Sequence, residues 1–68
     1  MILKEKMTPG TIVRGAKPLR ESTDRRIERW DDNYCVYRAR GSGEPFSGPD
    51  KKCWITTIED WAKEIIPN

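Results

Sequence analysis

The sequence offers few of the side chains that enzymes use for catalysis. It contains no histidine, which excludes an imidazole base, a histidine-activated nucleophile and a histidine metal site in this chain. The adjacent carboxylate pairs Asp31-Asp32 and Glu59-Asp60 are the remaining candidates for acid–base chemistry. They fall in a predicted turn and in the first turn of a predicted helix, where acidic residues commonly serve structure. The sequence therefore predicts a protein that is not an enzyme, with no catalytic residue and no cofactor.

Two cysteines, Cys35 and Cys53, lie 18 residues apart. A structural zinc site needs four ligands, so two cysteines without histidine cannot complete one, and no metal site is predicted. Because the cytosol keeps thiols reduced, we expect two free cysteines in the core. A disulfide between them is the alternative, and it would indicate an oxidising compartment.

Arginines gather on both sides of a predicted hairpin turn: Arg25, Arg26, Arg29, Arg38 and Arg40. In an antiparallel hairpin the two groups lie side by side. Strand alternation places Arg38 and Arg40 on one face with Val36, and Tyr37 with Cys35 on the other. A face with arginines beside exposed aromatic rings can follow a phosphate backbone and stack on bases. The alternative is a solvated outer face that protects strand edges from aggregation, and the acidic residues among the arginines favour it.

Aromatic side chains are the second candidate for binding. Tyr37 and Trp54 stand on predicted strands, where alternation turns some aromatic rings outward, and exposed Tyr, Trp and Arg concentrate protein-binding energy. Phe46 lies in residues 41–50, where three glycines and two prolines predict an exposed, flexible loop. The loop can be a plain connector, but an aromatic residue within it either folds back or meets a partner.

Charge is uneven along the chain. Residues 1–40 contain ten Lys or Arg and six Asp or Glu, and residues 41–68 contain three and five, which gives a formal net charge of +2. A protein that coats nucleic acid is normally more basic, so this balance favours a protein partner and leaves nucleic acid to one face. No stretch approaches the about 20 apolar residues of a membrane span, and the first residues lack the apolar core of a secretion signal. We therefore expect a cytoplasmic protein with no membrane partner.

Strand propensity is concentrated in four short segments: residues 11–15, 25–30, 34–40 and 51–56. The second and third segments are separated by Asp31-Asp32-Asn33, which predicts a hairpin closed at this turn. Residues 17–24 are polar and include Pro18, which predicts a loop between the first two strands.

Residues 57–66 are predicted to form an amphipathic helix. Apolar residues recur there at i, i+3, i+4 and i+7, namely Ile58, Trp61, Ala62 and Ile65. Thr56 and Glu59 have the spacing of a capping box, and Pro67 ends the segment. The apolar stripe is expected to close over the inner side chains of the strands: Ile12, Val13, Ile27, Val36 and Ile55.

The sequence therefore predicts one small domain over residues 1–68, which begins with an N-terminal segment over residues 1–9. Its predicted fold class is α+β, a small curled antiparallel sheet (an SH3-like partial barrel) covered by the C-terminal helix. Residue types in four segments, 10–14, 29–30, 34–37 and 53–62, resemble small SH3-like proteins encoded by phages and mobile elements. The first segment is also similar to plasmid-borne SH3-like dihydrofolate reductases. The chain lacks their Val-Gln-Ile-Tyr active-site strand, so that activity is not expected.

The resemblance covers residues 10–66 and implies an accessory or anti-defence protein. We expect a compact inhibitor that modulates a host macromolecular machine, such as a defence nuclease complex, by protein–protein contact. Its partner is then a host protein or nucleoprotein complex, and the alternative is a nucleic-acid-binding module that uses the arginine-rich hairpin face. The predicted binding surface comprises Arg25, Arg26, Arg29, Tyr37, Arg38, Arg40, Phe46 and Trp54.

Overall fold

A curved antiparallel sheet is the framework of the molecule. The computed structural model describes residues 1–19 and 22–67. In this part of the chain the elements are η1 (Lys4–Lys6), β1 (Ile12–Leu19), β2 (Ser22–Trp30), β3 (Tyr34–Arg40), β4 (Lys51–Trp54), α1 (Ile55–Trp61) and β5 (Ala62–Ile66). The five described strands form one sheet in the order β4-β3-β2-β1-β5, and neighbouring strands are antiparallel. The α+β class and the antiparallel sheet are thus confirmed, and the sheet stays open, with β4 and β5 at its edges.

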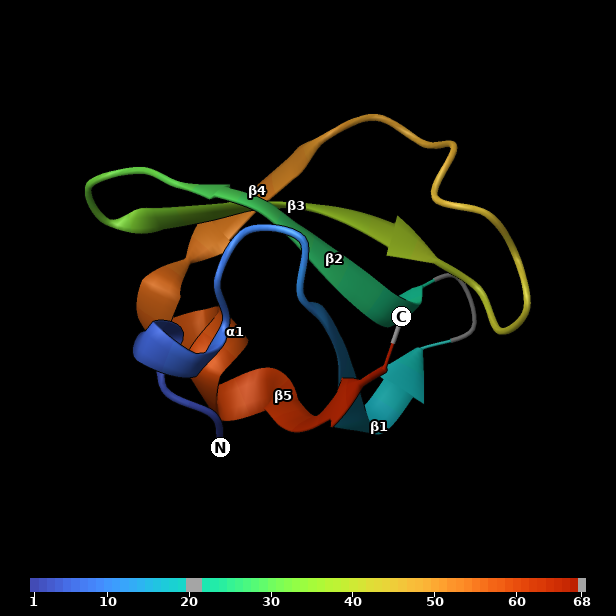
Figure 1. Ribbon diagram of the computed structural model, residues 1–68, viewed down its shortest axis with the longest axis horizontal. Coiled ribbons are helices and arrows are strands. Elements are labelled where there is room, and N and C mark those ends of the chain that lie inside the picture. The colour runs from blue at the N-terminus through green and yellow to red at the C-terminus, as the bar shows by residue number, and fades with distance from the viewer. Residues whose placement is uncertain (20–21, 68) are drawn as a thin grey trace.

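The strands from β1 to β4 pair in the order in which they occur along the chain, whereas β5 crosses over to pair with β1. Figure 1 shows α1 and η1 side by side at one end of the curved sheet, with the long β3–β4 loop at the other end. Backbone hydrogen bonding ties the first end together, because the N–H of Ile2 donates to the carbonyl of Glu59 at 3.1 Å.

The hairpin of β2 and β3 forms where the sequence predicts it. Trp30 pairs with Cys35 next to the turn, and the N–H of Asp31 donates to the carbonyl of Tyr34 at 2.9 Å. The register shifts between Ile27 and Arg29, so Glu28 is an extra residue on β2 and forms a bulge.

The predicted loop over residues 17–24 is wrong for residues 17–19 and 22–24, because β1 continues to Leu19 and β2 already begins at Ser22. Its remaining residues, 20–21, lie outside the described part of the chain. The polar residues that suggested a loop include Asp24, whose charge is neutralised by arginines on both neighbouring strands. Pro18 lies where the β1–β2 register is irregular, and an irregular pairing tolerates a residue without a backbone N–H.

The predicted helix over residues 57–66 is also wrong at both ends. Helix α1 spans Ile55–Trp61, and the chain then becomes extended at Ala62 (φ −69°, ψ 127°) to form β5. The reason is long-range pairing: β5 fills the second edge of β1, with Val13 opposite Ile65. Helical periodicity over a few residues cannot reveal a strand partner about 50 positions earlier.

The predicted capping box does not form either. Trp54, and not Thr56, is the N-cap of α1, and no side chain caps the helix. The Oε2 atom of Glu59 instead accepts a hydrogen bond of 2.8 Å from the backbone N–H of Lys4. Because β4 ends at Trp54, the predicted strand over residues 51–56 is two residues too long.

The core lies between the sheet and the two helices and contains Met7, Val13, Ile27, Cys35, Tyr37, Ile58 and Ala62. Of the predicted stripe, Ile58 and Ala62 are fully buried and Trp61 packs against the core. Ile65 instead lies on β5 and is 46% exposed. Ile12 and Val36 are buried as predicted, but neither is part of this cluster.

We expect Gly15→Ala to destabilise the fold. Gly15 on β1 is buried, and a Cβ atom there would overlap the indole ring of Trp61. Overpacking of this kind costs about 1–3 kcal/mol, which lowers the Tm of a domain of this size by at least about 4 °C. Gly48→Ala is the matched control, because nothing lies within 4 Å of a Cβ atom at that position. Equal Tm values for the two variants in thermal unfolding would contradict this contact.

Candidate functional site

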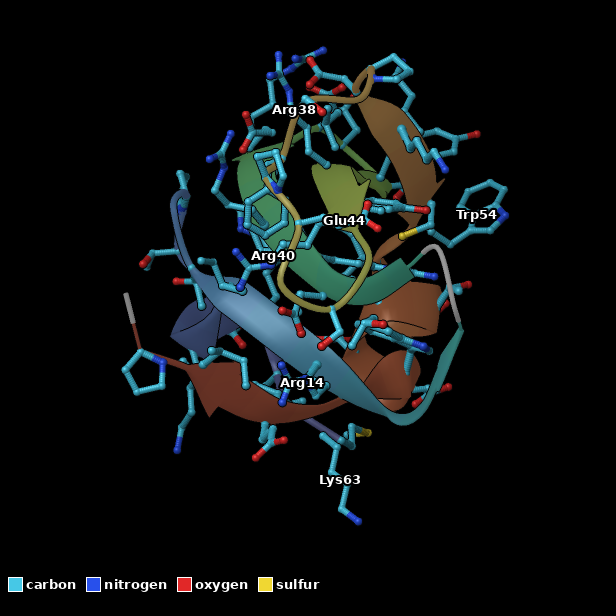
Figure 2. The ribbon with its side chains drawn as sticks, turned by 90° about the vertical axis from the view of Figure 1, so that its right-hand side faces the viewer. Arg14, Arg38, Arg40, Glu44, Trp54 and Lys63 are labelled. Carbon is cyan, nitrogen blue, oxygen red and sulfur yellow. The ribbon has the colours of Figure 1, made fainter. Side chains whose placement is uncertain are left out.

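A buried carboxylate organises the outer face of the sheet, the face turned away from the core. Asp24 on β2 lies opposite Arg14 on β1 and opposite Arg40 on β3, so the three residues form one row across three strands. Its side chain is 1% exposed. Arg14 donates to it through Nε at 2.8 Å and Nη2 at 3.4 Å, and Arg40 donates through Nε at 2.9 Å. Figure 2 shows Arg14 and Arg40 on the side of the molecule that faces the viewer.

These contacts decide the ionisation of Asp24. Burial alone raises the pKa of this carboxyl, but the hydrogen bonds and charges of Arg14 and Arg40 outweigh burial and lower the pKa below its ordinary value. Asp24 is therefore ionised at neutral pH, and one anion holds two cations in place.

A second network lies beside the first on the outer face. Glu28 Oε2 accepts from Arg26 Nε at 2.8 Å, and Asp50 Oδ1 accepts from Arg38 Nε at 2.7 Å. Arg38 also lies 3.6 Å from Glu28, which joins the two pairs. Arg29 is the most exposed arginine of these ion pairs, at 57%, and lies 3.6 Å from Asp31. Three of the five arginines predicted for this face, Arg26, Arg38 and Arg40, thus lie together on it, and carboxylates of the same chain already neutralise much of their charge.

The aromatic side chain of the long loop folds back onto this face. The Phe46 ring contacts two guanidinium groups, with its centroid 4.9 Å from that of Arg26 and 4.4 Å from that of Arg40. Together with the pair between Asp50 and Arg38, this contact ties residues 41–50 to the sheet at two points. Phe46 is therefore half-buried by contacts within the chain.

Two of the predicted binding residues lie on the other face. Tyr37 is 8% exposed and belongs to the core, because alternation along β3 turns it inward with Cys35. Burial raises the pKa of its hydroxyl. The guanidinium group of Arg25 lies over the rings of Tyr37 and Trp61, at 4.6 and 4.1 Å. The structure thus brings Arg26, Arg38, Arg40 and Phe46 together and separates Arg25 and Tyr37 from them.

The most exposed aromatic surface lies at the β4 edge. Tyr34 and Trp54 face each other across β3 and β4, and their ring centroids are 4.6 Å apart with an interplanar angle of 23°. We call this pair the aromatic platform. The rings are well exposed, Tyr34 at 37% and Trp54 at 55%, and the Lys52 ammonium lies 5.9 Å from the Tyr34 ring. Figure 2 shows Trp54 pointing away from the body of the molecule.

Sequence reasoning identified Trp54 but missed its partner Tyr34, and it missed Arg14 and Asp24 altogether. The β3–β4 register was the missing information, because a loop of ten residues leaves the pairing of its flanking strands undetermined. Asp24 lies among other charged residues of the sequence, and polarity alone gives no sign that its side chain is buried.

The two cysteines are free and lie directly opposite each other on β3 and β4. Cys35 is fully buried, as predicted for a core cysteine, whereas Cys53 is only half-buried. Within the described residues, no three His, Cys, Asp or Glu side chains are grouped as a metal site would require. None of the described helices is long and apolar enough to cross a membrane.

No protein-family model matches this chain, and comparisons with curated proteins and with solved structures find no match.

We expect Asp24→Asn to lower stability by about 2–3 kcal/mol, because it removes hydrogen bonds to charged groups from a buried position. The effect depends on pH. Since the folded-state pKa of Asp24 is lowered, its stabilisation is present above the unfolded-chain pKa of about 3.9 and is lost as pH falls through the folded value. Urea unfolding between pH 7 and pH 2 should therefore show a smaller acid-induced loss in the variant than in the wild type.

Asp50→Asn is the matched control, because the Asp50 side chain is 42% exposed. It should change stability by less than about 1 kcal/mol. Equal effects of the two substitutions at pH 7 would show that the buried row is not a special source of stability.

Proposed function

We propose that this chain is a small, non-enzymatic protein-binding module that docks through the aromatic platform of Tyr34 and Trp54. The observation that carries the proposal is the exposure of two stacked aromatic rings on a folded sheet. Apolar rings gain free energy when a partner covers them, and Trp and Tyr dominate the binding energy of protein interfaces. Mutual stacking also holds the rings in place before binding, so little side-chain entropy is lost on docking.

The free edge of β4 supports the same surface. The N–H of Ile55 donates to the carbonyl of Asn33 at 3.1 Å, so these two residues form a hydrogen-bonded pair. Hydrogen-bonded pairs alternate with non-hydrogen-bonded pairs along an antiparallel ladder. The N–H and C=O of Lys52, and the N–H of Trp54, therefore point away from β3. Because β4 is the outermost of the described strands on its side, these groups can pair with an extended segment of a partner.

Charge at this edge narrows the kind of partner. Lys51 and Lys52 are both exposed on β4. Lysines on an edge strand oppose pairing with the β4 of a second copy, and they favour a partner segment that carries acidic residues. The proposed partner is therefore a protein with an exposed acidic stretch.

The ion pairs of the outer face favour a protein partner over nucleic acid. Each of the arginines that would follow a phosphate backbone, Arg26, Arg38 and Arg40, has a carboxylate partner within 2.9 Å. A phosphate would have to displace these carboxylates, which reduces the gain from each contact.

We also propose that the fold is an SH3-like partial barrel and that the partner belongs to a host machine. The open, curled sheet that α1 covers on one side supports an SH3-like partial barrel. The resemblance to small proteins of phages and mobile elements makes the partner a component of a host machine, which the module would inhibit or modulate.

Trp54→Ala tests the proposal. The wild-type chain, immobilised and exposed to a host lysate, should retain a protein that remains after nuclease treatment. Trp54→Ala should weaken that binding about 30-fold or more, the effect of removing a central aromatic contact of about 2 kcal/mol. Because Trp54 is 55% exposed, the Tm should change little.

Leu3→Ala is the matched control, since Leu3 is 50% exposed and lines a hollow with Lys63 and Ile65 that includes neither residue of the platform. A partner lost with Leu3→Ala and kept with Trp54→Ala would move the docking surface to the N-terminal segment. Binding that disappears with nuclease, falls steeply with salt and requires Arg38 and Arg40 would instead establish the nucleic-acid alternative.

A further inference from the structure

The thiols of Cys35 and Cys53 meet across β3 and β4, on the side of the sheet opposite the aromatic platform. The register pairs the two residues directly, and both are free cysteines. The backbone N–H of Ile55 donates to the carbonyl of Asn33, two positions along the ladder from the cysteines. Because hydrogen-bonded pairs alternate along an antiparallel ladder, Cys35 and Cys53 are also a hydrogen-bonded pair. Residues in such a pair have Cα atoms about 5.5 Å apart, within the about 4.4–6.8 Å that disulfides span.

The two thiols differ in access and in acidity. Cys35 is 0% exposed on a central strand, whereas Cys53 is half-buried on the edge strand β4. The adjacent Cys35 thiol and the charge of Arg25 lower the pKa of Cys53, against the opposing effect of burial. The adjacent Cys53 and burial both raise the pKa of Cys35. One thiol is thus accessible and ionises easily, and the other lies behind it.

We infer that Cys35 and Cys53 form a reactive dithiol that exchanges with small disulfides such as glutathione disulfide, with Cys53 as the attacking and Cys35 as the resolving thiol. This inference is independent of the docking role proposed above. It rests on the direct cross-strand pairing of Cys35 with Cys53 and on the partial exposure of Cys53.

The exchange balances without any further reagent. The Cys53 thiolate attacks one sulfur of glutathione disulfide, the S–S bond of the reagent breaks, and one glutathione leaves as a thiolate. The released glutathione thiolate takes up the proton of Cys35, and the resulting Cys35 thiolate attacks the Cys53 sulfur. The second glutathione leaves as a thiolate and takes a proton from solvent. Two protein thiols are oxidised to one disulfide, and one glutathione disulfide is reduced to two glutathione molecules.

The test is incubation of the native protein with excess glutathione disulfide, followed by intact mass and thiol titration. The wild type should lose both thiols and the mass of two hydrogens, without retaining glutathione. Cys35→Ala should retain one glutathione, because the resolving thiol is missing. Cys53→Ala should stay unmodified while folded, because Cys35 is buried. A wild type that keeps both thiols, or a Cys53→Ala variant that reacts as fast as the wild type, would overturn the inference.

A second measurement needs no variant and remains valid if Cys35→Ala fails to fold. Iodoacetamide alkylation of the wild type, followed by peptide mapping, should label Cys53 at least ten-fold faster than Cys35. The rate should reach half its plateau at a pH below the pKa of about 8.5 of an ordinary thiol, because the pKa of Cys53 is lowered. Equal labelling of the two cysteines, or a half-plateau near the pKa of about 8.5 of an ordinary thiol, would refute the assigned roles.

Discussion

The buried carboxylate of Asp24 is the interaction on which the outer face depends. Burying one carboxylate without partners would be strongly unfavourable, so Arg14 and Arg40 must stay in place beside it. These partners come from the strands on either side, and the row therefore joins β1, β2 and β3. Arg40, once fixed, supplies half of the contact that holds Phe46. Asp24 thus contributes, through Arg40, to one of the two contacts that hold the long loop on the sheet.

Neutralisation of the arginines changes what the surface can recognise. The outer face satisfies its own charges, so its contribution to binding is smaller than its composition implies. The aromatic platform has no such internal compensation, because stacking leaves both rings partly exposed to water. The platform and the dithiol come from adjacent positions of the same two strands, at the pairs of Tyr34 with Trp54 and of Cys35 with Cys53. Alternation alone places them on opposite faces.

Local features of the sequence were predictable and distant pairings were not. The hairpin of β2 and β3 was predicted correctly because its turn and both strands lie within a few residues of each other. The C-terminal helix was predicted over residues 57–66 because its apolar spacing is helical, yet β5 exists because β1 offers an unpaired edge far away in sequence. Asp24 was read as a loop residue because polarity, without its partners, gives no sign of burial. In the candidate site, Trp54 was predictable from residue type, but its stacking on Tyr34 required the β3–β4 register.

The pairing of β5 with β1 has a consequence for synthesis of the chain on the ribosome. The strands from β1 to β4 pair with sequence neighbours and can assemble as they emerge. β1 then keeps one unpaired edge until residues 62–66 have left the ribosome, and core residues Ile58 and Ala62 are added at the same late stage. During translation the nascent sheet therefore exposes both an open strand and part of its core, the features by which incomplete chains pair with one another. Closure of β5 over β1 ends this interval.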